Sequence, residues 1–454
     1  MHAFLIFISS MGEFSIEDAA QQDAILKALV TDLSGGLREI IFPISTLLEL
    51  CSIGVAYDGS SFIGINNINS SDSILKGDPR TLVKVDESVA DIDKTEFWII
   101  CDIIDTAGHP HSNCARSQLQ HLQKELGKAW DGGQMMMGAE PEAFFVEKKE
   151  HLGTVNGGNT NYFNPRDPKS FLIAEIARVM GNMGFEIERA HAEVGDEQFE
   201  INWRFDLAER TADRIQYFKL ISHKVARNYG FDVTFLPKPY PTRNGSGMHC
   251  HLSVGNDTDN LFYDAGRKEF KNFSEKALQF LTGILSHSRS LAAIANPTEV
   301  SYSRLVPGFE APCVVAMGAC NRSALCRIPA VADEKLWEKA IRAEFRFPDP
   351  MTNPYLLAAG FIATGLDGLE NKIAFNGFCD EDLYAMSLQE LRARNFDLLP
   401  RTLWESFSNF EKNEVLRDRL GASMHSSFGT ILLDEIDACQ PFANAESVRR
   451  HYFD

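Results

Sequence analysis

The chain has 454 residues, of which 44% are hydrophobic, 24% charged and 10% aromatic, a composition typical of a globular protein with two or three domains. Its 44 Lys and Arg against 63 Asp and Glu give a net charge of −19, which repels a phosphate backbone and disfavours nucleic-acid binding. Apolar stretches are too short to cross a bilayer, and the nine scattered cysteines form no CxxC pair, so we expect a cytoplasmic protein without a disulfide framework or membrane anchor.

The N-terminal part of the chain predicts a small α+β unit. Apolar spacing predicts an amphipathic helix over residues 16–27, and two short strands follow over 28–32 and 38–42. A polar stretch rich in Gly, Ser and Asn over 54–73 is expected to be a loop. The apolar run TEFWIICDII at 95–104 predicts a buried strand that closes the unit.

An Ala-Gly-His-Pro turn at 107–110 predicts the end of this unit, so we expect one domain over 11–107 and a second over 116–454. Strands and helices alternate in the second domain, which predicts a large α+β fold that becomes mostly helical after Asp380. The predicted helices span 116–130, 170–183, 211–228, 274–294 and 355–368. The predicted strands span 135–147, 185–190, 198–205, 232–236, 247–254, 324–328 and 343–347.

A Glu-Pro-Glu motif, Glu140-Pro141-Glu142, lies within one predicted strand. Residues two apart on a strand project from the same face, so both carboxylates should point one way. Two like charges this close need a cation, unless both are solvated at a sheet edge. The apolar run at 143–146 argues for burial and therefore favours a cation-binding site.

A His-x-His motif at His249 and His251 repeats this geometry directly after the glycine-rich turn 244–247. Two imidazoles on one face, beside backbone that can approach a ligand closely, are typical of a metal or ligand site. Buried histidines that hydrogen-bond only within the protein give the same pattern. The motif alone leaves both interpretations open.

The segment Arg-Ala-Glu-Phe-Arg alternates strictly between charged and apolar residues. Arg342, Glu344 and Arg346 should share one face of a strand, while the residues between them face the core. A ladder of salt bridges explains this pattern as well as a binding wall does. Three further arginines lie upstream in mostly apolar surroundings, at Arg304, Arg322 and Arg327. A hydrophobic core does not require so many guanidinium groups, so they favour a site that recognises phosphate or carboxylate.

Glu193 and Glu200 flank a polar turn between two predicted strands, and both can be read as surface acids. With the motifs above they form a set of carboxylates and imidazoles that suits Mg²⁺ or Mn²⁺ better than structural zinc. Divalent ions, arginines and a glycine-rich turn together favour phosphoryl transfer from a nucleotide. The sequence has no Walker A motif, no dinucleotide-binding GxGxxG after a strand and no protein-kinase motifs, so any nucleotide site belongs to another fold.

Taken in order, these motifs resemble those of the glutamine synthetase family over nearly the whole chain. The family's DGSS loop is matched at 58–61 with Asp72 downstream, its ExE strand at 140–142, and its signature loop by NGSGMHCHLS at 244–253. The remaining matches are RLVPGFEAP at 304–312, NRS at 321–323 and RAEFRFPDP at 342–350. Six ordered motifs are too specific to arise by chance.

The resemblance implies an α+β fold with a small N-terminal β-grasp domain and a large catalytic domain, in which helices flank a curved antiparallel sheet. It also implies a homo-oligomer with active sites between subunits, in bacteria usually a dodecamer of two hexameric rings. The implied reaction joins ammonia to the γ-carboxylate of L-glutamate with ATP, through γ-glutamyl phosphate, and gives L-glutamine, ADP and phosphate.

The resemblance also implies a role for individual residues, including the ligands of two Mg²⁺ or Mn²⁺ ions. One ion would be held by Glu142, Glu193 and Glu200, and the second by Glu140, His249 and Glu344. Matched catalytic groups are Asp58 from the adjacent subunit, Glu310 on a flap, Arg322 and Arg342. Matched substrate-binding groups are Asn244, Gly245, Arg304 and Arg346. Matched nucleotide-binding groups are Glu188, His251, Ser253, Arg327 and Lys339.

Some segments depart from the family pattern and put the acceptor amine in doubt. Where the family usually has His-His-Glu, this chain has His191-Ala192-Glu193, and where the family has Gly-Gln-His-Glu, it has Glu197-Gln198-Phe199-Glu200. The run 300–304 before the flap also differs, and Cys320 stands where an arginine or glutamine is common. Three functions stay open: glutamine synthetase, a γ-glutamylamide ligase that uses methylamine, ethanolamine or a polyamine, and a non-catalytic structural or regulatory ring. The chain retains all expected metal ligands, which disfavours the non-catalytic ring. The sequence does not decide whether Tyr384 is modified.

Overall fold

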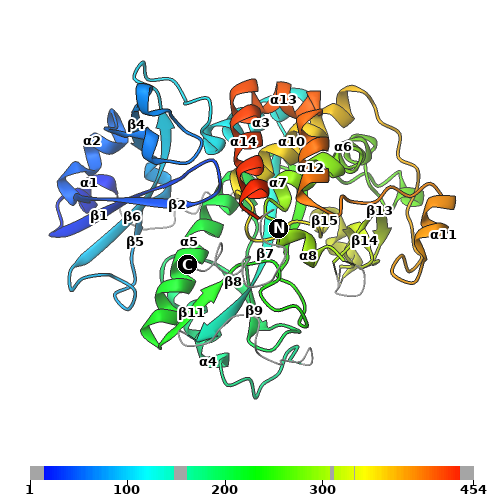
Figure 1. Cartoon of the computed structure of the whole chain (residues 1–454), viewed down its shortest axis with the longest axis horizontal. Coiled ribbons are helices and arrows are strands. Elements are labelled where there is room, and N and C mark those ends of the chain that lie inside the picture. The colour runs from blue at the N-terminus through cyan, green and yellow to red at the C-terminus, as the bar shows by residue number, and fades with distance from the viewer. Residues whose placement is uncertain (1–14, 148–160, 307–310, 332, 440–454) are drawn as a thin grey trace.

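The structure, a computed structural model, describes residues 15–147, 161–306, 311–331 and 333–439. Two sheets organise the chain, and Figure 1 shows a small N-terminal lobe beside a larger body. Strands before residue 105 build the first sheet, and strands after residue 133 build the second. Among the described residues, no helix is both long and apolar enough to cross a membrane.

The N-terminal sheet has the strand order β2-β1-β6-β4-β3, and β5 pairs with another part of β6. The buried strands β1 (Ala24–Thr31) and β6 (Thr95–Ile104) run parallel, and all other pairings in this sheet are antiparallel. The remaining elements are α1 (Ile16–Ala20), α2 (Leu47–Ser52), β2 (Leu37–Pro43), β3 (Val55–Asp58), β4 (Asp72–Gly77) and β5 (Val83–Lys84). This arrangement is the small α+β fold expected from the sequence, but the expected loop at 54–73 is wrong where β3 forms.

The predicted N-terminal helix over 16–27 is wrong beyond Ala20. Ser15 caps the helix start, and the following apolar run enters β1, where nearly every residue is buried. Lys27 lies in this core because its ammonium group pairs with Glu39 at 3.4 Å and Glu96 at 3.3 Å. A run that is buried on both faces shows no alternation, so its spacing resembles that of a helix.

The second sheet has the order β13-β14-β15-β12-β7-β9-β8, and β10 and β11 pair with other parts of the long strand β7 (Gln134–Glu147). Every pairing is antiparallel except that of β13 with β14, so the expected antiparallel sheet carries one parallel strand at its edge. The other strands are β8 (Ile187–Ala192), β9 (Gln198–Trp203), β10 (Asp206–Leu207), β11 (Phe231–Thr234), β12 (Met248–Gly255), β13 (Val314–Ala319), β14 (Ala324–Ile328) and β15 (Ala343–Phe345). The sequence pattern indicated neither β10 nor β13.

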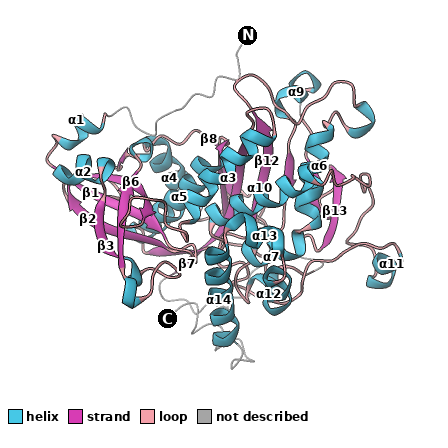
Figure 2. Cartoon of the chain, turned by 90° about the horizontal axis from the view of Figure 1, so that it is seen from above, coloured by secondary structure: helices cyan, strands magenta, loops and turns pink. Residues whose placement is uncertain are grey.

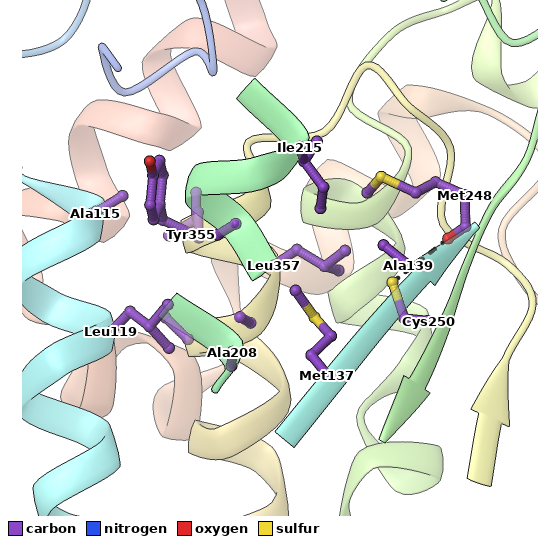
Figure 3. Close-up of a cluster of buried hydrophobic side chains, with 14 of the residues drawn as sticks. Ala115, Leu119, Met137, Ala139, Ala208, Ile215, Met248, Cys250, Tyr355 and Leu357 are labelled. Carbon is purple, nitrogen blue, oxygen red and sulfur yellow. Dashed lines mark hydrogen bonds between the residues drawn. The ribbon is translucent and has the colours of Figure 1, made fainter. Parts of the chain in front are cut away.

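Helices cover one face of this sheet and bury its apolar side chains. Figure 2 shows α3 (Ala115–Ala129), α5 (Ala208–Asn228) and α10 (Pro354–Glu370) alongside the strands. Figure 3 shows side chains of β7 and β12 packed among those of the three helices, including Met137, Ala139, Met248, Cys250, Ala115, Leu119, Ile215 and Leu357. The residues that alternate with these on β7 and β12 therefore point to the opposite face.

The remaining helices complete the larger body. They are α4 (Ser170–Asn182), α6 (Glu275–Ser286), α7 (Ser288–Ala295), α8 (Ser301–Arg304), α9 (Trp337–Ala340), α11 (Leu388–Ala393), α12 (Leu403–Glu411), α13 (Glu414–Leu420) and α14 (Ala422–Cys439). The single helix predicted over 274–294 is two helices that meet at His287. The His287 ring lies 2.9 Å from both Asp367 and Asn413, and these contacts hold the junction in place.

Arg116, at the start of α3, joins the two lobes through buried ion pairs. Its guanidinium donates to Asp78 at 2.7 Å and Asp102 at 2.9 Å in the N-terminal lobe, and to Asp213 of α5 at 2.9 Å. Burial raises the pKa of Asp213 to about 6 although Arg116 opposes the rise. Burial also disfavours ionised Asp78, but Arg80 and Arg116 outweigh this effect and lower its pKa. Arg116 is thus the shared cation of several buried acids.

Replacing Arg116 by Met should lower the free energy of unfolding by about 3–5 kcal/mol, because buried aspartates would lose their cation. The measurement is the thermal unfolding midpoint at equal protein concentration. Arg178→Met is the control, since Arg178 also reaches the N-terminal lobe, at Asp86, but its side chain is 44% exposed. This surface change should cost about 1 kcal/mol or less. An equally small decrease of the unfolding midpoint in both variants would contradict the assigned role of Arg116.

Candidate active site

The face of the second sheet opposite the helices carries a pocket of about 310 Å³. Glu140 and Glu142 of β7, His249 and His251 of β12 and Glu344 of β15 line it, because they alternate with the core residues of those strands. Six arginines also line it, namely Arg189, Arg304, Arg322, Arg327, Arg342 and Arg346. The pocket is therefore polar, with acids and guanidinium groups side by side.

Cross-strand pairing aligns these side chains in rows. Residues directly opposite each other on paired strands have Cβ atoms about 5 Å apart, so their side chains meet. The opposite pairs are His249 with Glu140, His251 with Glu344, Glu142 with Glu200, and His191 with Glu200. The short motifs of the sequence thus converge because each has a period of two and the register places them on one face.

The first acidic cluster comprises Glu142, Glu193, Glu200 and His191. The His191 ring lies 3.4 Å from Glu200 and 3.7 Å from Glu193. The Glu142 carboxylate accepts hydrogen bonds from the Gln198 side chain at 3.0 Å and from a backbone amide at 2.9 Å. Burial and repulsion from Glu193 and Glu200 nevertheless raise the pKa of Glu142 well above its usual value. This cluster holds more negative charge than its surroundings compensate.

The second acidic cluster comprises Glu140, Glu344, His249 and His251. The His251 ring lies 3.1 Å from Glu140, and the His249 ring lies 3.5 Å from Glu140 and 3.7 Å from Glu344. Burial opposes ionisation of Glu344, but His251, His249 and the neighbouring arginines lower its pKa to about 2. Burial of Glu140 is likewise outweighed by both histidines, which hold its pKa well below the usual value. Both carboxylates are therefore ionised at neutral pH.

The donor atoms of these clusters fit divalent ions. His191, Glu193 and Glu200 can bring one donor atom each within 4.8 Å of one another, and so can Glu140, His251 and Glu344. Carboxylate oxygens with an imidazole nitrogen suit Mg²⁺ or Mn²⁺. The raised pKa of Glu142 in the first cluster also indicates that a cation would stabilise the charged form.

Arginines form a wall along the β14 and β15 side of the pocket. Arg346 donates to Glu344 at 2.7 Å, and Arg327 donates to the same carboxylate at 2.5 Å. Arg342 donates to the His251 ring at 3.2 Å. Arg304 is buried and donates to the carbonyl oxygens of residues 347 and 346 at 2.8 and 3.0 Å. These contacts fix most of the wall before any ligand binds.

The glycine-rich turn at the edge of the pocket has a steric cause. A Cβ on Gly245 would lie 2.4 Å from the carbonyl oxygen of Pro237 and 2.8 Å from Cγ of Arg304. Only glycine fits at this contact. The turn thereby brings Asn244 and Gly245 to the pocket wall next to Arg304.

Four of the candidate site residues that the structure describes do not line this pocket. Asp58 lies at the end of β3, opposite Asp72, where its carboxylate accepts hydrogen bonds from Ser60 and Ser61. Glu188 is exposed on β8, and Ser253 lies on the same face of β12 as His251 but is absent from the pocket lining. Lys339 lines a second cavity. Glu310 lies outside the described residues. All other expected site residues line the pocket, namely Glu140, Glu142, Glu193, Glu200, His249, Glu344, Asn244, Gly245, Arg304, Arg346, Arg322, Arg342, His251 and Arg327.

Several residues that line the pocket were not among the candidate site residues. His191 and Arg189 lie two and four residues before Glu193, and the period of β8 offered a signal for both. Gln198 precedes Glu200 by two residues in the same way. Tyr162 lies in an irregular segment, where its ring contacts His191 edge-on at 5.6 Å, and no local pattern indicates it.

Comparison with known proteins shows the family of the chain. The family model for the glutamine synthetase catalytic domain matches residues 112–451. A glutamine synthetase of Methanocaldococcus jannaschii is 35% identical over 89% of this chain and 90% of its own length, and one of Thermus thermophilus is 36% identical over 89% and 90%. A solved structure of GmaS with ADP superposes with a TM-score of 0.83 at 27% identity, covering 97% of this chain and 99% of GmaS. The chain therefore belongs to the glutamine synthetase family of ligases, which use ATP and divalent metal ions.

Proposed function

We propose that this protein is a glutamate-ammonia ligase, which joins ammonia to the γ-carboxylate of L-glutamate through γ-glutamyl phosphate and converts ATP to ADP and phosphate. The observation that carries the proposal is the pair of acidic clusters beside a wall of arginines in one pocket. By resemblance we assign Glu142, Glu193 and Glu200 to one Mg²⁺ or Mn²⁺ ion, and Glu140, His249 and Glu344 to a second. The donor atoms that lie within 4.8 Å of one another include His191 in place of Glu142 and His251 in place of His249. Such ions would neutralise phosphate oxygens during phosphoryl transfer.

Arg322 and Arg342 are the proposed catalytic cations of this chain. Their positive charge would stabilise the negative charge that develops on the transferring phosphoryl group. Arg342 is already oriented by its contacts with His251 and the carbonyl of Ala340, so little reorganisation is needed. Nucleotide binding is assigned to Glu188, His251, Ser253, Arg327 and Lys339, by resemblance.

The proposed substrate-binding groups are Asn244, Gly245, Arg304 and Arg346. Arg304 and Arg346 are both 3% exposed, so their positive charges lie in surroundings of low dielectric. Charge attraction is stronger in such surroundings than in water. This supports recognition of the two carboxylates of glutamate at this end of the pocket.

Asp58 and Glu310 are the proposed acids that attract ammonium and accept its proton. Hydrogen bonds from Ser60 and Ser61 lower the pKa of Asp58, so its carboxylate is ionised at neutral pH. Asp58 does not line the pocket of its own chain, and the proposal therefore requires a neighbouring subunit to supply it. We accordingly propose a homo-oligomer, a dodecamer of two hexameric rings, in which residues 11–107 form the β-grasp domain and 116–454 the catalytic domain.

The departures from the family pattern lend little support to a larger acceptor amine. Phe199 is fully buried and stacks on Phe145 at 4.3 Å, on the core side of β9. Ala192 and Val300 are also buried and do not line the pocket. These substitutions therefore change the core and leave the pocket wall unaltered, which favours ammonia over methylamine, ethanolamine or a polyamine.

The choice of acceptor is tested by glutamate-dependent release of phosphate from ATP with Mg²⁺ or Mn²⁺. Ammonium, methylamine, ethanolamine and putrescine are compared at equal concentrations of the free amine. We expect kcat/KM to be highest for ammonium, because Ala192, Phe199 and Val300 do not line the pocket. A preference for an organic amine would assign the protein to the γ-glutamylamide ligases. Absence of phosphate release with all four amines would favour a non-catalytic ring.

Replacing Glu344 by Gln should lower kcat by about 100-fold or more, because the variant removes a charge that the second acidic cluster needs for its cation. The amide retains the shape of the carboxylate, so the fold and the oligomer should persist. Glu186→Gln, at an acid whose side chain is 59% exposed, is the control and should leave kcat unchanged. Full ATP turnover by the Glu344 variant would contradict the assigned second metal site.

A further inference from the structure

Arg189 reaches the pocket because β8 contains a bulge. Ile187 lies opposite Trp203 and Arg189 lies opposite Asn202, so Glu188 is an extra residue without a partner on β9. Ile187 packs against the core, whereas Arg189 lines the pocket. A bulge lets one strand change the face to which its side chains point, and bulges commonly redirect a side chain beside a binding site.

The Arg189 guanidinium is less constrained than most others in the pocket. Its side chain is 58% exposed, and its ion pair is with Glu140 at 3.9 Å. By contrast, Arg304, Arg342 and Arg346 each donate shorter hydrogen bonds to the protein. No hydrogen bond holds the Arg189 side chain within the described residues, so its donors are available to a ligand.

The position of Arg189 is opposite to that of the arginine wall. Arg327 lies on β14 and Arg342 directly precedes β15, while Arg189 lies on β8 at the other end of the sheet order. Strands β12, β7 and β9 lie between them and carry most residues of the acidic clusters, namely His249, His251, Glu140, Glu142 and Glu200. A polyanion bound over these clusters would therefore have guanidinium groups on both sides.

The contact with Glu140 connects Arg189 to the second acidic cluster. Glu140 is approached by His249 and His251 from β12 and by Arg189 from β8. Glu140 is also one of the acids that fit a divalent ion. If its carboxylate binds such an ion, less of its charge is left to hold Arg189, which can then turn to phosphate oxygens.

We propose that Arg189 is a phosphate-binding residue that holds the triphosphate of the nucleotide from the β8 side of the pocket. This assignment rests on the proposed function, since it takes ATP as the ligand. The planar guanidinium can donate two parallel hydrogen bonds to phosphate oxygens, which a lysine ammonium does not reproduce. Arg189 thus completes a two-sided clamp with Arg327 and Arg342.

The test is calorimetric binding of the β,γ-imido analogue of ATP in the presence of Mn²⁺, by the full-length protein and its variants. Arg189→Ala should raise the Kd about tenfold, because a hydrogen bond between charged groups is lost. Arg189→Lys should give an intermediate Kd. Arg204→Ala is the matched control, since the Arg204 side chain is 56% exposed on the adjacent segment and does not line the pocket.

Steady-state kinetics separate this role from a structural one. We expect the KM for ATP to rise with Arg189→Ala, while the KM for glutamate and the thermal unfolding midpoint stay as in the wild type. Unchanged analogue binding, or a rise confined to the KM for glutamate, would overturn the assignment of Arg189 alone. Failure of the wild type to bind the analogue would overturn the proposed function and this assignment together.

Discussion

The concentration of carboxylates on one face of a single sheet is the constraint on which the rest of the site depends. Glu140 and Glu142 of β7, Glu200 of β9 and Glu344 of β15 project from one face of the sheet, at positions that the register places together. Such close like charges repel one another, and burial strengthens that repulsion. The clustered arginines and histidines offset part of it, and the remaining charge is what a divalent cation would neutralise.

The opposite face of the same strands explains why this arrangement is stable. Apolar residues alternate with the acids and histidines and pack against α3, α5 and α10, as Figure 3 shows for Met137, Ala139, Met248 and Cys250. Each strand therefore contributes both to the core and to the pocket. Because Phe199 and Ala192 lie on the buried side, these departures from the family pattern alter packing and leave the pocket face unchanged.

The predictable part of the structure follows from local periodicity. Period two placed the carboxylates of the ExE motif, the imidazoles of the HxH motif and the arginines around Glu344 on one face, and the pocket contains them. The prediction of a helix over 16–27 failed because β1 is buried on both faces and its sequence shows no alternation. The bulge in β8 between Ile187 and Arg189 has no local signal in the sequence, and neither has the contact of Tyr162 with His191, because Tyr162 lies in an irregular segment. Asp58 lies outside the pocket of its own chain, and no single-chain pattern tests the proposal that a neighbouring subunit supplies it.

Thermal unfolding with and without Mn²⁺ tests most directly whether the acidic clusters are built for cations. Wild-type protein should unfold at higher temperature as Mn²⁺ is added, because a ligand that binds the folded state stabilises it. Glu142→Gln should be more stable than wild type without metal, since it relieves repulsion from Glu193 and Glu200, and it should gain less from Mn²⁺. Identical midpoints for both proteins, with and without Mn²⁺, would contradict the account.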